Sequence, residues 1–310
     1  MSQRGPIVCA TDLGQTGARA VDLAARMASA TGRPLRLVHV TGAGPQADRP
    51  EAEMTEAERV LRDRLRTRIE RAAAALEKER QRVEGLGPHA EAELLEGRAW
   101  EETLEYAIRH DASVIVVGPH GEGGPRELLR DSLREFVLGS TADRIVRHAP
   151  MPVLVASREG GSSDRIHGRS WLVAVDFSEA SRAALAEAHE LAEQCQAKLL
   201  PLHVLPDHEP QAEGPDPLRF GEALTSEAGK RALAELERLV EDVTQKAIPC
   251  RIGLGEPASA VSIAAAELDA ALIVMGTRGL TGIRHLLLGS TAERTLRRSP
   301  VPVLCVPTRG

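Results

Sequence analysis

The stretch Leu272-Ile273-Val274-Met275-Gly276-Thr277-Arg278-Gly279 joins a short apolar run to a pair of glycines. An apolar run of this length that ends in glycine is typical of a strand buried on both faces in a parallel sheet. Nine residues later, Gly289-Ser290-Thr291 opens a helical pattern that continues through Ala292 and Leu296. A strand, a glycine loop and a helix start in this order predict an α/β unit whose loop lies at the carboxyl end of the sheet.

The chain contains this arrangement twice. Gly118-x2-Gly121 precedes Gly276-x2-Gly279 by 158 residues, and Leu-Gly-Ser-Thr at 138–141 precedes the same four residues at 288–291 by 150. Asp12 and Asp176 follow short apolar runs 164 residues apart. Matches that keep their order, with two changes of offset, indicate a duplicated domain.

A polar, glycine-rich segment at 157–164 separates the two copies and has the composition of a flexible linker. We therefore expect a first domain at 1–156, a linker at 157–169 and a second domain at 170–310. The length of 310 residues is sufficient for two domains of ordinary size.

Strands alternate with helices in both copies, which predicts parallel sheets with right-handed crossovers. In the second copy we expect strands at 172–175, 199–204, 248–252, 271–275 and 301–306. Helical spacing relates Ala180, Ala184, Ala188, Leu191 and Cys195 in one helix and Leu233, Leu236, Val240 and Val243 in another. Ser178 is placed to cap the first of these helices. In the first copy, Leu61, Leu65, Ile69, Ala72 and Leu76 form one apolar stripe on a long charged helix.

Composition argues against several classes of partner. The formal net charge is -6, and the chain has only two tryptophans, one tyrosine and three phenylalanines, so neither a basic face nor a base-stacking platform for nucleic acid is expected. There is no signal stretch at the N-terminus and no apolar run long enough for a membrane span, so we expect a cytoplasmic protein. The four cysteines are widely spaced and are expected to be structural.

The glycine constellation predicts a phosphate site. A glycine lets the backbone approach a phosphate, while Ser290 and Thr291 add hydroxyls beside the unpaired amides of a helix start. Arg278 adds positive charge. The alternative is that these glycines only form a turn, but the strand before them and the helix after them favour a phosphate site.

Gly276-x2-Gly279-x9-Gly289-Ser290 resembles the ATP-binding motif of the universal stress protein family. The opening Val173-Ala174-Val175-Asp176-Phe177-Ser178 and the ending Pro300-Val301-Pro302-Val303-Leu304 are also similar to that family. The resemblance covers both copies. It implies two tandem Rossmann-like domains of the adenine nucleotide alpha hydrolase-like type, each with a five-stranded parallel sheet in the order 3-2-1-4-5.

The resemblance also implies roles for individual residues. Asp176 would lie at the adenosine or metal, and Val204 would contact adenine through its backbone. The ribose and phosphates would be held by Met275, Gly276, Arg278, Gly279, Gly289, Ser290 and Thr291. The matching positions of the first copy are Asp12, Val40, Gly118, Gly121, Gly139, Ser140 and Thr141.

The first copy departs from the motif, because 17 residues instead of nine separate Gly121 from Gly139. The longer loop contains Glu122 and Glu127, whose charge opposes phosphate binding, so the occupancy of this site stays open. The nucleotide is therefore expected mainly in the second domain, as ATP with Mg²⁺ or Mn²⁺.

No catalytic residues and no metal site built from protein ligands alone are expected. His203, Asp207 and His208 are close in sequence but match no standard ligand spacing, and His39 and His203 fit structural positions at strand ends. The leading hypothesis is an ATP-binding stress-response regulator. The alternatives are an interaction module that has lost nucleotide binding and a slow ATPase. The last strands, at 151–156 and 301–306, are expected to pair within the chain as an internal pseudo-dimer.

Overall fold

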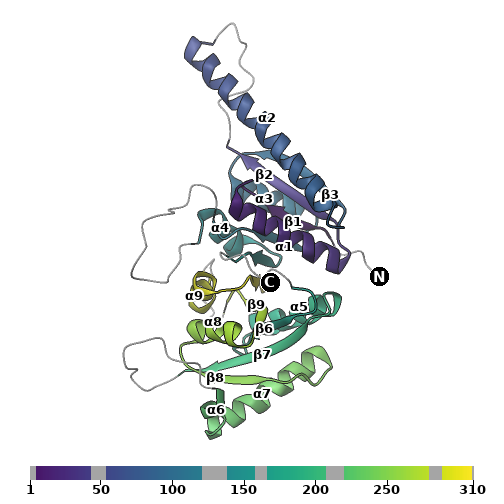
Figure 1. Ribbon diagram of the computed structural model, residues 1–310. Helices are drawn as coiled ribbons and strands as arrows, with labels where there is room; N and C mark the ends of the chain where they lie inside the picture. The colour runs from purple at the N-terminus through teal and green to yellow at the C-terminus, as the bar shows by residue number, and fades with distance from the viewer. Residues whose placement is uncertain are drawn as a thin grey trace.

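The computed structural model of the chain describes residues 5–42, 54–120, 138–157, 166–206, 220–278 and 288–308. Two similar halves lie side by side, each with helices packed on a sheet (Figure 1). The first half contains β1 (Ile7–Ala10), α1 (Gln15–Thr31), β2 (Leu35–Thr41), α2 (Glu56–Glu84), β3 (Ala90–Glu96), α3 (Ala99–Arg109), β4 (Val114–Val117), α4 (Ser140–His148) and β5 (Val153–Val155). The second half contains β6 (Ser170–Ala174), α5 (Glu179–Gln194), β7 (Lys198–Leu205), α6 (Phe220–Ala223), α7 (Glu227–Thr244), β8 (Arg251–Leu254), α8 (Pro257–Glu267), β9 (Ala270–Gly276), α9 (Ser290–Arg298) and β10 (Val303–Val306).

The ten strands form one sheet in the order β3-β2-β1-β4-β5-β10-β9-β6-β7-β8. Within each half all neighbouring strands are parallel. When each half is numbered from its own first strand, both halves have the order 3-2-1-4-5. The winding reverses between the first and fourth strands of each half, which is where an open α/β sheet offers a crevice for a ligand.

The halves join through β5 and β10, which pair antiparallel with Leu154 opposite Leu304. Each of these strands would otherwise be an exposed edge of its own sheet, so the pairing covers both edges. Because the pairing is antiparallel, the carboxyl ends of the strands in one half point opposite to those in the other half.

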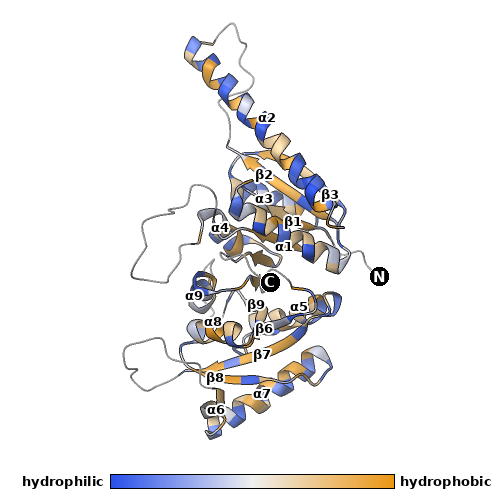
Figure 2. Ribbon diagram, in the orientation of Figure 1, coloured by the Kyte–Doolittle hydropathy of each residue, from blue (hydrophilic) through white to orange (hydrophobic). Residues whose placement is uncertain are grey.

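The core has two layers, one on each face of the continuous sheet. Buried residues of α1, α2, α5 and α7 share one cluster, and those of α3, α4, α8 and α9 share the other. Both clusters contain residues from both halves. In Figure 2 the strands are mostly apolar, whereas α2 carries long hydrophilic stretches.

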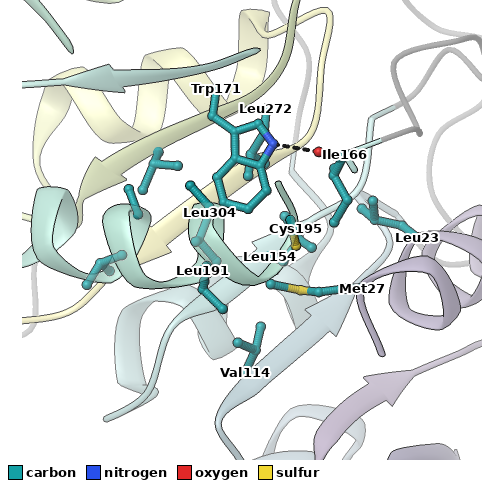
Figure 3. Close-up of a cluster of buried hydrophobic side chains, with 14 of the residues drawn as sticks. Leu23, Met27, Val114, Leu154, Ile166, Trp171, Leu191, Cys195, Leu272 and Leu304 are labelled. Atoms are coloured by element: carbon teal, nitrogen blue, oxygen red, sulfur yellow. Dashed lines mark hydrogen bonds between the residues drawn. The ribbon is translucent and has the colours of Figure 1, made fainter. Parts of the chain in front are cut away.

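The first cluster continues across the junction of the halves (Figure 3). Leu23 and Met27 of α1 lie there near Cys195 and Leu191 from the second half. Trp171 is fully buried, and its Nε1 donates a hydrogen bond to the carbonyl oxygen of Ile166 at 2.9 Å. The end of the segment expected to be a linker is therefore packed into the core.

Several strand boundaries expected from the sequence are wrong. The last strands begin at Val153 and Val303, two residues later than expected, and the largest error concerns the third strand of the second half. The third strand of the second half begins at Arg251, not at residue 248. Pro249 has no N–H to donate to a strand ladder, and β8 pairs with β7 only from Arg251 onward. Ile248 and Cys250 are partly buried against the core without joining the sheet.

The apolar stripe of α2 is only partly a core face. Leu76 is buried, but Leu61 is 52% exposed. A helix of 29 residues is about 44 Å long, whereas the seven-residue strand β3 beneath it extends about 23 Å. The N-terminal half of α2 consequently projects beyond the sheet (Figure 1).

No helix in the described parts of the chain combines the length and the apolar character that crossing a membrane requires.

The pairing of β5 with β10 predicts the cost of a cavity at the junction. Leu304 is fully buried, so Leu304→Ala should lower the free energy of unfolding by about 2–5 kcal/mol. Leu86 is 55% exposed, and Leu86→Ala should stay within about 0.5 kcal/mol of wild type. Denaturant unfolding measures both; equal stability of the two variants would contradict the proposed importance of this junction.

Candidate functional site

A cavity of about 230 Å³ lies at the carboxyl ends of β6, β7 and β9 in the second half. Every residue of the second copy that the sequence assigned to the site and that the structure describes lines this cavity. They are Asp176, Val204, Met275, Gly276, Arg278, Gly289, Ser290 and Thr291. Gly279 lies outside the described residues. Residues from four separate segments therefore meet at the place where the winding reverses.

The first half has a matching cavity of about 560 Å³. It is lined by Asp12, Val40, Gly118, Gly139, Ser140 and Thr141, the expected residues of the first copy. Gly121 and the inserted residues Glu122 and Glu127 lie outside the described residues. Because β5 and β10 pair antiparallel, the strands of the two halves run in opposite directions, and the two cavities open toward opposite ends of the strands.

The loop after the first strand of each half has the same unusual backbone. Leu13 and Phe177, which directly follow Asp12 and Asp176, have φ angles of 63° and 65°. This left-handed conformation costs a non-glycine residue about 1–2 kcal/mol. Its repetition in both halves marks the loop as a site held in one shape by its surroundings.

The two aspartates are held by this turn. Oδ1 of Asp12 accepts a hydrogen bond from the Gly14 amide at 2.9 Å. Oδ1 of Asp176 accepts hydrogen bonds from the Ser178 amide at 3.1 Å and from its hydroxyl at 2.5 Å. The cap of α5 is Ser178, whose Oγ accepts from the Ser181 amide, as the sequence predicted. Asp176 orients this cap and is not itself the cap.

Asp12 has a second oxygen available. Its Oδ2 is buried and has no hydrogen-bond partner among the described residues. A buried carboxylate oxygen without a donor is costly, so a ligand hydroxyl or a cation at this point would be favourable.

A helix starts at the glycine side of each cavity. The N-caps Gly139 of α4 and Gly289 of α9 provide no side-chain hydrogen bond to the first helical amides. The next three residues of each helix line the cavity. Amides left open at a helix start, together with the helix dipole, form a favourable site for an anion.

The glycine at the end of β9 has a packing role that the sequence did not indicate. A Cβ on Gly276 would lie 2.7 Å from the Cβ of Ala180 and 2.8 Å from its carbonyl carbon. Gly276 therefore allows β9 to approach the first turn of α5. Its missing side chain faces this helix, so closeness to a phosphate is not needed to explain the glycine.

Arg278, which was expected to contact the phosphates, and the two histidines, which were expected to be structural, are all engaged within the protein. Arg278 lines the cavity, but its Nη1 donates to the Thr308 hydroxyl at 3.3 Å. His39 and His203 line the two cavities, and their Nδ1 atoms contact the carbonyl oxygens of Thr11 and Val175 at 2.8 and 2.7 Å. Both histidines thus hold the Asp-containing turns. Asp207 and His208 lie outside the described residues.

Sequence reasoning missed the cavity walls contributed by α1, α3, α5 and α8. These are Gly17, Ala99 and Thr103 in the first half and Ser181, Pro257 and Val261 in the second. They belong to no motif, and tertiary packing alone brings them to the strand ends. The sequence held one signal for them: each wall residue of the first half precedes its counterpart in the second half by 164 or 158 residues, the same offsets that relate the motifs.

The fold and the paired cavities define a tandem α/β protein of the doubly wound type, with one crevice per half. The sequence profile of the Universal stress protein family matches residues 3–157 and again 169–307. The chain belongs to this family.

Individual relatives agree with this assignment. A universal stress protein of Thermus aquaticus is 37% identical over 139 residues, which cover 44% of this chain and 96% of the relative. Universal stress protein YxiE of Bacillus subtilis is 33% identical over 153 residues, with the same shares. A crystal structure of a universal stress protein from Archaeoglobus fulgidus superimposes with a TM-score of 0.70 over 99% of this chain and all of that one, at 22% identity. This last likeness shows a common fold across both halves.

The cysteines are free, and Cys9, Cys195 and Cys305 are buried. Burial raises the pKa of Cys9, raises the pKa of Cys305 to about 12, and raises those of Cys195 and Cys250 to about 11. Across the described stretches, no group of three or more His, Cys, Asp or Glu residues is arranged to hold a metal ion. The burial of three of the four thiols agrees with the structural role expected for the cysteines.

The packing of Gly276 predicts that Gly276→Ala destabilises the fold by about 1–3 kcal/mol, because the added methyl overlaps Ala180. Gly42→Ala is the matched control, since its nearest contact would be Arg68 Nη2 at 3.8 Å. Thermal and denaturant unfolding compare the two variants. A Gly276→Ala protein as stable as the control would show that β9 does not need this glycine.

The raised thiol pKa values predict slow modification of the native protein. At pH 8, Cys195 and Cys250 should react with Ellman's reagent at least about 10-fold more slowly than free cysteine, because the smaller ionised fraction outweighs the greater nucleophilicity of a thiolate of higher pKa. All four thiols should react after unfolding in guanidinium. A native thiol that reacts as fast as free cysteine would contradict the assignment.

Proposed function

We propose that this protein binds ATP and that nucleotide occupancy regulates its contacts with a partner in the cellular stress response. The observation that carries the proposal is the convergence of the predicted residues on one cavity in each half. An aspartate turn and an uncapped helix start both line each cavity. Apolar strand ends between them suit a purine base, and the helix start suits phosphates.

The main site is proposed in the C-terminal half. Only there does the sequence keep the short spacing Gly276-x2-Gly279-x9-Gly289-Ser290, with Arg278 beside it. Arg278 would reach the phosphates by exchanging its hydrogen bond to Thr308. Mg²⁺ or Mn²⁺ would bind through the phosphate oxygens, with Asp176 nearby. The N-terminal cavity is a second candidate site.

Binding without turnover fits the cavity best. Among the described lining residues, the groups that could accept a proton are Asp176 and His203, and both already hold neighbouring backbone through Oδ1 and Nδ1. Without a dedicated base, hydrolysis would depend on positioning and a metal ion and would be slow. An interaction module without nucleotide is the other alternative.

The pairing of β5 with β10 supports an internal pseudo-dimer, in which one chain supplies both halves of the unit. Four free thiols fit a reducing compartment, so we propose the cytoplasm as the place of action.

Calorimetry with ATP and Mg²⁺ or Mn²⁺ tests the proposal. Wild type should bind about one equivalent tightly, and Gly289→Val should abolish this event because a side chain would occupy the phosphate approach. Gly139→Val, the matched change in the first half, should leave it intact. No heat and no thermal shift with either metal ion would refute nucleotide binding and leave the interaction module.

A further inference from the structure

The two cavities are built on the same backbone plan but are filled differently. The duplication pairs their lining residues at offsets of 164 and 158. At four paired positions the second half carries the larger side chain: Gly17 and Ser181, Val38 and Leu202, Ala99 and Pro257, Val117 and Met275. All four of these differences therefore reduce the space in the second cavity relative to the first.

The volumes follow the side chains. The cavity of the first half, about 560 Å³, lies within the range of about 300–1,000 Å³ that is usual for ligand pockets. The cavity of the second half, about 230 Å³, lies below it. Larger side chains at these four positions contribute to the smaller volume of the second cavity.

These differences lie away from the phosphate end of the cavities. Phosphates would lie at the starts of α4 and α9, after the fourth strands. Val38 and Leu202 each lie three residues before the carboxyl end of their strand, β2 and β7, and Ala99 and Pro257 begin α3 and α8. If the proposed function holds, these two pairs surround the base.

One wall position also differs in polarity. Thr103 of α3 is fully buried in the wall of the larger cavity, and its hydroxyl has no hydrogen-bond partner among the described residues. Its counterpart in α8 is Val261. A ligand that hydrogen-bonds the Thr103 hydroxyl would remove the cost of leaving it unpaired in an apolar wall. Val261 has no hydroxyl and cannot make this hydrogen bond.

We propose that the two halves select different nucleotides. The N-terminal cavity accepts purine nucleotides enlarged on the base, with Val38, Ala99 and Thr103 as the specificity-determining residues. The C-terminal cavity accepts only the unsubstituted base, because Leu202 and Pro257 fill the additional space. This inference rests on the proposed function and adds the selectivity of each site.

N6-benzyl-ATP and ATP, titrated separately with Mg²⁺ by calorimetry, test this selectivity. The analogue should bind wild type at one site, its binding should be lost in Gly139→Val, and it should persist in Gly289→Val. Val38→Leu should weaken the analogue at least about tenfold, as a pocket does when one methylene of space is removed, with little change for ATP. The reciprocal double change Leu202→Val with Pro257→Ala, which removes both side chains that fill the space, should add a second site for the analogue.

Thr103→Val provides an independent readout. It should weaken ATP about 3- to 10-fold at the site that Gly139→Val removes, through loss of one hydrogen bond. Val261→Thr, its counterpart, should leave that site unchanged.

Two outcomes would overturn the selectivity while leaving nucleotide binding in place. One is equal binding of the analogue at both sites or at neither, and the other is loss of the analogue in Gly289→Val alone. Failure of ATP itself to bind would overturn the proposed function and the selectivity together.

Discussion

The antiparallel contact between β5 and β10 is the constraint on which the whole molecule depends. It turns two half-sheets into one, covers an edge of each, and lets the core clusters run across the junction. Because the contact is antiparallel, the two cavities lie at opposite ends of the strands. Arg147 at the end of α4 bonds Glu293 in the first turn of α9 at 3.5 Å, so the helix that opens the second cavity is tied to the first half. The two sites are therefore separate in space but share one continuous sheet and core.

The alternation of strands and helices was readable from the sequence because each element has its own hydrophobic period. The predictions were wrong where a hydrophobic pattern in one segment could not show which element that segment packs against or pairs with. The segment 248–252 was expected to be a strand, yet Pro249 delays pairing until Arg251. The stripe on α2 marks the face that could be buried, but the sheet is too short to cover Leu61. Periodicity shows which face of a helix or strand is apolar, but that face is buried only where a neighbouring element is long enough to cover it.

The site was predictable to the extent that it consists of strand ends. Carboxyl ends of parallel strands must meet at one edge, so the order of the elements along the chain is enough to place Asp176, Val204 and Gly276 together. The helix walls could not be placed in this way, because Thr103 and Val261 are ordinary helical positions whose importance comes from packing. The positive φ of Leu13 and Phe177 was equally hidden, since neither residue type prefers that conformation.

Gly276 shows that a glycine motif in the sequence does not by itself establish a binding site. The approach of α5 to β9 requires a glycine there, whether or not a nucleotide is present. A glycine motif can therefore persist in a half whose cavity has been narrowed, and a departure from the motif can accompany a half whose cavity is roomy. This chain shows both cases: the second half keeps the motif around about 230 Å³, and the first half departs from it around about 560 Å³. Ligand selectivity must then be argued from the side chains that fill the crevice, since the described strand ends and helix starts that frame it are common to both halves.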